Sequence, residues 1–303
     1  MIAADRRAVD SVGSLRRLAA SAGEPPLRHV CDACPHACQL GAGQTGLCHA
    51  RIGGEDGVVS DSFGRITALA LDPIEKKPLA HYQPGTTVLS IGSYGCNLEC
   101  PWCQNARISC ATAQDVPWTP MTPQQLVKQA LELRHQGCIG LAYTYNEPLI
   151  APEFLEECMR LAHDAGLKNV LVSNGMATER QLEWLTPLID AANIDLKGFL
   201  PETYRICHGS LTAVKATIQA LAQAAACHLE ITWLVVPGVT DDLQEFHSAV
   251  AWIASLDPDI PLHVTRFFPR HKMSDAAPTP VGTVHAFADE ARKLLSRVQV
   301  GNC

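Results

Sequence analysis

Three cysteines lie on one short stretch of the chain, Cys96, Cys100 and Cys103, with the spacing C-x3-C-x2-C. The apolar run 87–91 before them predicts a buried strand, so the thiols are expected on the loop that follows it. Three thiolates can hold three corners of a cubane iron–sulfur cluster, whereas the usual all-cysteine site has four ligands. Because Cys110 fits no tight loop spacing, one iron would keep an open position, as catalytic metal sites do. A zinc knuckle or a loop of reduced cysteines is the alternative.

The composition predicts a globular protein with a sizeable core. Of the 303 residues, 47% are hydrophobic, and no run reaches the 18 apolar residues that a membrane helix needs. The formal net charge of −7 argues against a non-specific nucleic-acid binder, which needs a basic surface. Neither a membrane nor a long nucleic acid is therefore expected as a partner.

Cysteine usage predicts a reducing compartment. The chain has 13 cysteines, and its first 24 residues contain arginines but no apolar core of the kind a secretory signal has. Apolar residues recur there at every third position, which predicts a short surface helix, with a transit peptide as the alternative. The expected location is the cytoplasm. Cysteines outside the two groups described here are expected to be small hydrophobic residues or exposed thiols.

A second cysteine group comes earlier in the chain, with the spacing C-x2-C-x3-C-x9-C. Proline and glycine interrupt the segment, so it cannot build a core by itself and is expected to need a metal for order. Four thiolates suit a tetrahedral zinc site or a second iron–sulfur cluster, and two disulfides or free thiols are the alternatives. The members of this predicted second metal site are Cys31, Cys34, Cys38 and Cys48.

Strands and helices alternate after the three-cysteine loop, which predicts parallel βα units. Capping-box sequences at Thr122–Gln125 and Thr178–Gln181 predict two of the helix starts. We expect a partial (β/α)6 TIM-like barrel of parallel strands with a small N-terminal cysteine-rich metal-binding segment. The expected division is an N-terminal helix or extension at 1–30, a cysteine-rich segment and connector at 31–84, and the barrel at 85–303. The expected strands are 87–91, 138–143, 169–173, 192–196, 229–236 and 262–268, and the last helix is expected at 284–298.

Polar residues follow the predicted strands one after another. In barrels of this kind the carboxyl ends of the strands carry the chemistry, so these residues are expected to meet at one mouth. Taken singly, each group is also explained by a turn or a surface ion pair. The groups are Thr144–Pro148, Ser173–Gly175, Asp195–Lys197, Pro237–Asp241 and Arg266–His271.

The C-x3-C-x2-C loop, with Trp102 just before its third cysteine, resembles the signature of the radical S-adenosylmethionine (radical SAM) superfamily. The resemblance implies a 4Fe–4S cluster whose open iron is chelated by the methionine part of S-adenosylmethionine (SAM). It further implies reductive cleavage of SAM to a 5′-deoxyadenosyl radical, which abstracts a hydrogen atom.

Within that superfamily the order of motifs resembles the pyruvate formate-lyase activating enzyme group. The resemblance implies that Glu147 contacts the methionine amine and Lys197 the methionine carboxylate, with Asp195 orienting it or holding a monovalent cation. His271 would contact the ribose, and Trp102 would lie beside the adenine. The cofactor-binding residues so implied are Trp102, Asn146, Glu147, Ser173, Asn174, Asp195, Lys197 and His271.

The match is closer to the branch called AmmeMemoRadiSam system radical SAM enzymes, through 72–79, Arg266–Pro269 and the N-terminal cysteines. The expected function is a radical SAM oxidoreductase that takes hydrogen from a glycine or peptide of a partner protein, as a glycyl-radical activase does. A flavodoxin or ferredoxin would be the reducing partner. The alternatives are modification of a small molecule or nucleotide, or iron–sulfur electron transfer without SAM cleavage. A mere electron carrier would not need Glu147, Asp195 and Lys197.

Overall fold

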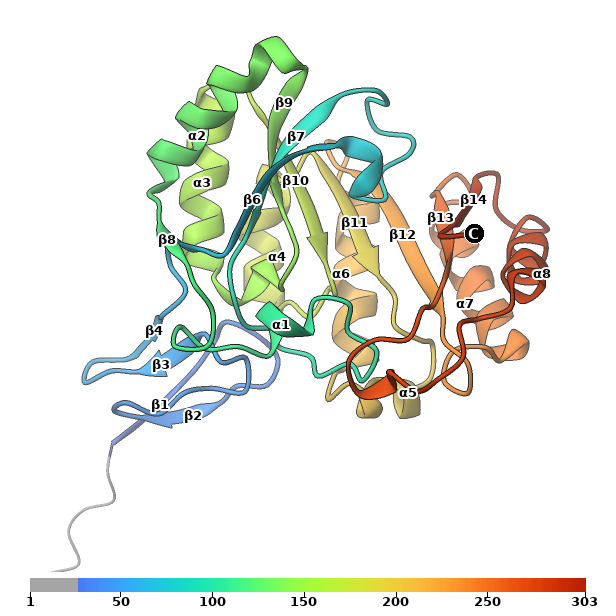
Figure 1. Cartoon of the computed structure of the whole chain (residues 1–303), viewed down its shortest axis with the longest axis horizontal. Helices are drawn as coiled ribbons and strands as arrows, with labels where there is room; N and C mark the ends of the chain where they lie inside the picture. The colour runs from blue at the N-terminus through green and yellow to red at the C-terminus, as the bar shows by residue number, and fades with distance from the viewer. Residues whose placement is uncertain (1–26) are drawn as a thin grey trace, which may run out of the picture.

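The computed structural model describes residues 27–303. The helix predicted within the first 24 residues therefore lies outside the described residues. The described part consists of a large sheet covered by helices, with a smaller β-rich module at its amino-terminal end (Figure 1).

The large sheet has eight strands in the order β14-β13-β12-β11-β10-β9-β7-β6. Neighbouring strands pair in parallel, except that β6 pairs with β7 in the antiparallel direction. This sheet confirms the predicted partial TIM-like barrel. Its strands are β6 (Ala68–Pro73), β7 (Thr87–Gly92), β9 (Cys138–Tyr143), β10 (Lys168–Ser173), β11 (Ala191–Asp195), β12 (His228–Val235), β13 (Leu262–Arg266) and β14 (Val298–Gly301).

The end of the chain differs from the prediction. The last helix, α8 (Val281–Ala291), stops seven residues before the predicted 298, and β14 then adds a seventh parallel strand where six were expected. Val298 pairs with Leu262 of β13, and Val300 pairs with Val264. β-branched residues favour a half-buried strand edge over a helix, and the neighbouring strand supplies hydrogen bonds that the local sequence does not reveal.

Helices connect the strands and begin where the sequence indicates. The capping boxes predicted at Thr122 and Thr178 are both present, each with its side chain accepting from the backbone three residues later. The connecting helices are α2 (Pro123–Glu132), α3 (Pro152–Asp164), α4 (Glu179–Leu185), α5 (Pro201–Ile206), α6 (Leu211–Gln223) and α7 (Leu243–Leu256).

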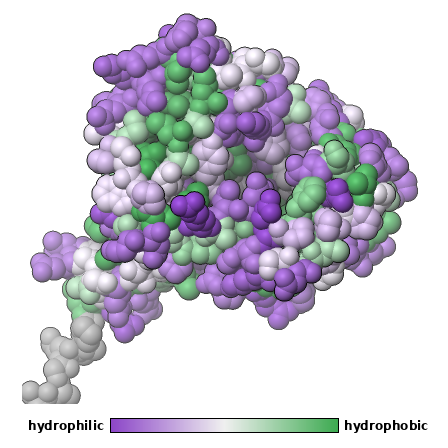
Figure 2. All heavy atoms as spheres, viewed as in Figure 1, coloured by the Kyte–Doolittle hydropathy of each residue, from purple (hydrophilic) through white to green (hydrophobic). Residues whose placement is uncertain are grey.

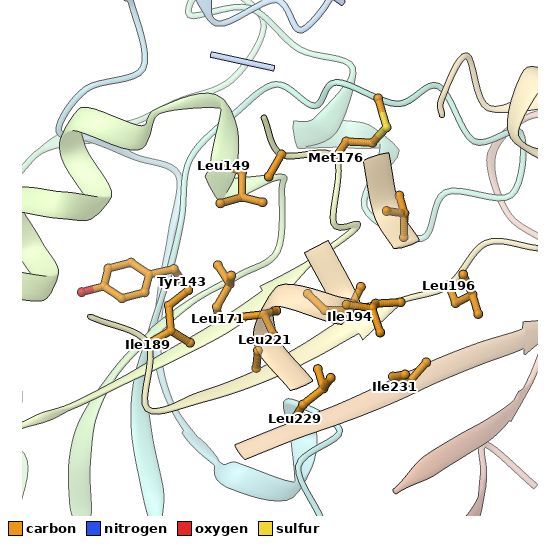
Figure 3. Close-up of a cluster of buried hydrophobic side chains, with 14 of the residues drawn as sticks. Tyr143, Leu149, Leu171, Met176, Ile189, Ile194, Leu196, Leu221, Leu229 and Ile231 are labelled. Carbon is orange, nitrogen blue, oxygen red and sulfur yellow. The ribbon is translucent and has the colours of Figure 1, made fainter. Parts of the chain in front are cut away.

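The main core fixes the helices against the sheet. Leu171, Ile194 and Ile231, from three adjacent strands, belong to one buried cluster with Leu221 of α6 (Figure 3). Burying an aliphatic side chain of this size stabilises the fold by roughly 1.5–3 kcal/mol. This packing sets the relative positions of the strand ends.

The connector between β6 and β7 covers the opposite, inner face of the sheet. Ile74 and Leu79 of the connector pack with Val88, Val170 and Ala191, which point away from the helix-covered face. The backbone amides of the connector residues 80 and 81 donate to the buried carboxylate Glu230 of β12, at 3.1 and 2.8 Å. The end of the predicted connector is thus tied to the barrel.

The N-terminal module contains two small antiparallel hairpins and few core residues. Strands β1 (Arg28–Val30) and β2 (Gln39–Gly41) form one hairpin, and β3 (Arg51–Gly53) and β4 (Val58–Ser60) form the other. Between these hairpins and the large sheet, β5 (Arg65–Ile66) pairs with β8 (Thr119–Pro120). In Figure 1 the module lies beyond the carboxyl ends of the barrel strands, on the side of β7 and α1.

The surface is predominantly polar in the view of Figure 2, with apolar side chains scattered among hydrophilic ones. Within residues 27–303, the helices are all too short or too polar to cross a membrane.

Candidate active site

The three-cysteine loop follows the carboxyl end of β7, and the side chain of Asn146 holds the residues that lead into it. The Oδ1 atom of Asn146 accepts from the amide of Ser93 at 2.9 Å. Its Nδ2 atom donates to the carbonyls of Tyr94 and Gly95, both at 3.1 Å. These bonds occupy the side-chain amide of Asn146. The residue was predicted to contact the cofactor, but in the structure it fixes the conformation of the loop.

Hydrogen-bond donors surround the loop sulfurs. The Sγ of Cys96 accepts from the amide of Leu98 at 3.3 Å, and Nδ2 of Asn174 lies 3.6 Å from the same sulfur. The Sγ of Cys103 lies 3.2 Å from the hydroxyl of Ser109, in the short helix α1 (Ala106–Ser109). Donors of this kind set the reduction potential of thiolate-bound clusters.

The three loop thiols lie close enough to influence one another. Burial raises the pKa of Cys96, and the charges of Glu147, Cys100 and Cys103 add to that rise. Burial also raises the pKa of Cys103, and the charge of Cys100 contributes. By contrast, a hydrogen bond from the Cys207 thiol lowers the pKa of Cys100.

The donor set fits the cluster that the sequence predicts. In the described part of the chain, no three His, Cys, Asp or Glu side chains are already arranged around a metal position, so the loop thiols would have to turn toward a common centre. They are three adjacent soft ligands on one loop, with amide and hydroxyl donors to sulfur, which is the chemistry that iron–sulfur clusters require.

A half-buried ion pair lies beside these thiols, after the carboxyl end of β11. The Nζ of Lys197 is 2.9 Å from Oδ2 of Asp195. Burial acts to lower the pKa of Lys197, but the charges of Asp195, Cys100 and Cys103 outweigh it and raise that pKa. The side chains of Asp195 and Lys197 are 36% and 18% exposed, so a ligand can reach both charges from solvent.

Glu147 joins the ends of β9 and β10. Its carboxylate accepts from the hydroxyl of Ser173 at 2.7 Å, the amide of Asn174 at 2.8 Å and the amide of Leu149 at 3.0 Å. Complete burial raises the pKa of Glu147 to about 7, against the opposing effect of these hydrogen bonds. Three donors leave one acceptor position of the carboxylate free.

A hollow with about 490 Å³ of empty space, partly open to solvent, lies next to the loop. His271, which follows β13, lines this hollow together with Cys96. The sequence analysis expected the residues at the strand ends to meet at one mouth of the barrel, and these two do. The amide of Lys272 donates to the carbonyl of Pro101 at 2.9 Å and ties this segment to the loop. The other lining residues are His49, Leu98, Glu99, Ser109, Cys110 and Lys272.

Trp102 occupies a different environment from His271. Its ring belongs to the main core and is 4% exposed. Its indole Nε1 has no hydrogen-bond partner among the residues described. The structure therefore brings most of the predicted residues to one end of the barrel but buries the tryptophan among apolar side chains.

Two further residues belong to this site although the sequence analysis did not select them. Asn97 is buried between Asn174 and the carbonyl of Met176, at 2.9 and 3.0 Å. In the sequence, its position between Cys96 and Cys100 could have identified it as part of the site. Cys207, expected to be a plain apolar residue, instead lies beside Cys100, and its carbonyl accepts from the amide of Glu99 at 3.0 Å. No spacing rule connects residues so far apart in the chain.

Comparisons with known proteins agree with this geometry. A sequence model described as the Radical SAM superfamily matches residues 90–250. An uncharacterized protein of Methanocaldococcus jannaschii is 34% identical over 274 residues, which cover 90% of this chain and 80% of that protein.

Solved structures are similar at lower identity. Streptococcus suis SuiB bound to S-adenosylmethionine superposes with a TM-score of 0.55 at 8% identity, over 71% of this chain and 52% of SuiB. A domain of the pyruvate-formate lyase-activating enzyme from Bacteroides vulgatus superposes with a TM-score of 0.45 at 18% identity, over 53% of this chain and 98% of that domain.

Proposed function

The chain belongs to the radical SAM superfamily, and we propose that it uses a 4Fe–4S cluster on Cys96, Cys100 and Cys103 to generate a radical that abstracts hydrogen from a glycine or peptide of a partner protein. When bound, the cluster supplies the electron that cleaves SAM to a 5′-deoxyadenosyl radical. The observation that carries the SAM assignment is the ion pair of Lys197 and Asp195 beside two of the loop thiols.

Lys197 and Asp195 would bind the amino-acid part of SAM. An ammonium group held next to Cys100 suits a methionine carboxylate that approaches the same loop, because charge-assisted hydrogen bonds are strong in a partly buried site. Asp195 keeps Lys197 charged and in place. An electron carrier without SAM would leave this pair without a ligand.

Glu147 would act mainly as a positioning residue. It holds the backbone of Asn174, whose amide group points at the sulfur of Cys96. Its one free acceptor position can take a hydrogen bond from the methionine amine, as the family resemblance implies. His271, exposed on the hollow that Cys96 also lines, would contact the ribose.

An opening to solvent supports a large substrate. The hollow beside Cys96 is partly open, and its rim carries the charged residues Glu99 and Lys272. A peptide segment of a partner protein can enter such a site while the rest of the partner stays outside. A flavodoxin or ferredoxin would supply the electron, and a reducing cytoplasm suits a chain whose 13 cysteines are all free.

The test is anaerobic reconstitution with iron and sulfide, followed by dithionite and SAM, with 5′-deoxyadenosine measured over time. We expect the product with the natural chain and with Cys303→Ala, which removes an exposed cysteine that does not line the hollow. We expect none with the Cys96/Cys100/Cys103 triple alanine variant. An intact cluster that gives no product and no spectral change with SAM would support electron transfer instead.

A candidate substrate is tested in the same assay. Peptides containing the glycine loop of a glycyl-radical enzyme should accelerate formation of 5′-deoxyadenosine and produce a glycyl radical signal. Acceleration by a nucleotide or another small molecule, with none by peptides, would overturn the activase assignment.

A further inference from the structure

The N-terminal cysteines lie near one another, although no three side chains within residues 27–303 are already arranged around a metal position. Cys31, Cys34 and Cys48 are buried, with 4%, 7% and 5% exposure, and Cys38 is half-buried. The amide of Cys31 donates to the carbonyl of Cys38 at 2.8 Å, which brings the two hairpin ends together. The pKa of Cys34, which burial raises to about 12, is also affected by the charges of the other three thiols.

A buried cation lies next to this group. Arg51 is 2% exposed, and its Nη1 donates to both carboxylate oxygens of Glu153, at 2.7 and 2.8 Å. Its guanidinium also interacts with the side chain of Cys31. Its Nε is buried and has no hydrogen-bond partner within residues 27–303. A buried guanidinium with a free N–H in this neighbourhood suits a group that stabilises a negatively charged metal–thiolate centre without binding the metal itself.

The module has too little apolar packing to hold this arrangement by itself. Its buried cluster consists of Cys31, Ala33 and Leu40, with Cys38 and Val58 packed against them. Two of the five residues in this cluster are themselves cysteines. Modules with so small a core usually depend on disulfides or a metal, and the thiols here are free.

We propose that Cys31, Cys34, Cys38 and Cys48 bind one zinc ion in a tetrahedral, structural site. This site lies apart from the proposed SAM chemistry and does not rest on it. Four thiolates close the coordination sphere of zinc, as structural zinc sites require, and leave no position for a substrate. The four side chains turn toward a common centre when the ion binds.

Zinc is favoured over a second iron–sulfur cluster by the packing. Three of the four thiols are already buried and the fourth is half-buried, so the packed chain surrounds them. One ion needs less space between the thiols than a cubane of eight atoms.

The experiment uses the full chain with Cys96, Cys100 and Cys103 all replaced by alanine, so that the proposed SAM cluster cannot form. Metal content is measured by plasma mass spectrometry after expression with zinc and iron both supplied. We expect about one zinc per chain and no stoichiometric iron or sulfide. Adding Cys34→Ala should remove the zinc, whereas adding Cys227→Ala, outside both cysteine groups, should leave it.

A second measurement keeps the test valid if the Cys34→Ala variant does not fold. Cobalt added to the metal-stripped triple variant should give the visible spectrum of a tetrahedral tetrathiolate site, at one cobalt per chain. Iron and sulfide in place of zinc, or no bound metal in a folded triple variant, would overturn the zinc site. None of these readouts involves SAM, so failure here is distinguishable from failure of the proposed function.

Discussion

The carbonyl oxygen of Cys48 accepts a hydrogen bond from the backbone amide of Cys96 at 3.1 Å. The last cysteine of the N-terminal group thus contacts the first cysteine of the three-cysteine loop. His36 adds a second contact between the N-terminal module and the loop, because its Nε2 lies 2.8 Å from the carbonyl oxygen of Asn97. The N-terminal module therefore supports the loop that would carry the SAM cluster.

Gly95→Ala should break this contact. A Cβ at residue 95 would lie 2.3 Å from the carbonyl oxygen of Cys48, and the residue has φ of +86°. We expect a loss of about 1–3 kcal/mol in the free energy of unfolding beyond that of Gly85→Ala, measured with denaturant. Gly85 has a similar φ of +82° but open space around it, so it isolates the cost of the backbone conformation. Equal losses in both variants would contradict the close approach.

Cys100→Ala and Cys34→Ala should behave differently. Cys100→Ala should abolish the change that SAM causes in the cluster's electron paramagnetic resonance signal. Cys34→Ala should retain that signal in the molecules that fold, but lower the free energy of unfolding, because it removes a ligand of the proposed structural ion. If both variants folded fully and lost the signal to the same extent, the two cysteine groups would not be separate sites.

Asn174→Ala should lower the reduction potential of the cluster. The amide group of Asn174 lies 3.6 Å from the sulfur of Cys96, and a donor to sulfur stabilises the more negative, reduced state. A redox titration of the reconstituted protein measures the shift. Gln181→Ala is the control, since Gln181 donates to the carbonyl of Leu149 and has no contact with the loop sulfurs. An unchanged or higher potential in Asn174→Ala would contradict the assigned role.

Lys197→Met should weaken SAM binding at least about tenfold, which corresponds to about 1.4 kcal/mol. The substitution keeps the side-chain length but removes the charge expected to meet the methionine carboxylate. Equilibrium binding to the reconstituted protein measures the effect, and circular dichroism checks folding. Lys128→Met, on the exposed face of α2 with a lysine side chain 77% exposed, should leave the affinity unchanged. Unaltered affinity in Lys197→Met would remove the main support for the SAM assignment.

The free energy of unfolding should decrease in acid because Glu230, the buried carboxylate of β12, becomes protonated. Burial acts to raise the pKa of Glu230, but hydrogen bonds from His228, His263 and the connector amide at 81 outweigh it and lower the pKa from 4.5 to about 2. Because the folded pKa lies below the unfolded one, this stabilisation is present above pH 4.5 and is lost as the pH falls toward 2. A shift of this size is on the order of 3 kcal/mol.

Urea unfolding between pH 5 and pH 3 tests this expectation. Glu230→Gln should be less stable than the natural chain at pH 5, and its stability should fall less steeply with acid. Glu75→Gln is the control, because Glu75 is exposed and, within residues 27–303, its carboxylate accepts from the amide of Gly85 alone, at 2.7 Å. Parallel pH profiles for Glu230→Gln and the natural chain would show that Glu230 is not the group responsible.

Much of this protein was determined by local sequence patterns. The buried runs predicted β9 at 138–143 as observed, and the capping boxes at Thr122 and Thr178 marked two helix starts. These features depend on residues close together in the chain, where periodicity and capping chemistry act. The order of strands and helices also predicted which end of the sheet would carry the polar residues.

Contacts between distant segments were decided only by the tertiary structure. Packing brought Cys207 to Cys100, joined Cys48 to Cys96, and turned Asn146 from an expected cofactor contact into the support of the loop. It also paired Val298–Gly301 with β13, although the last helix had been expected to continue to 298. Such contacts depend on how strands and helices pack in three dimensions, so spacing along the chain identified the reactive groups but not their neighbours.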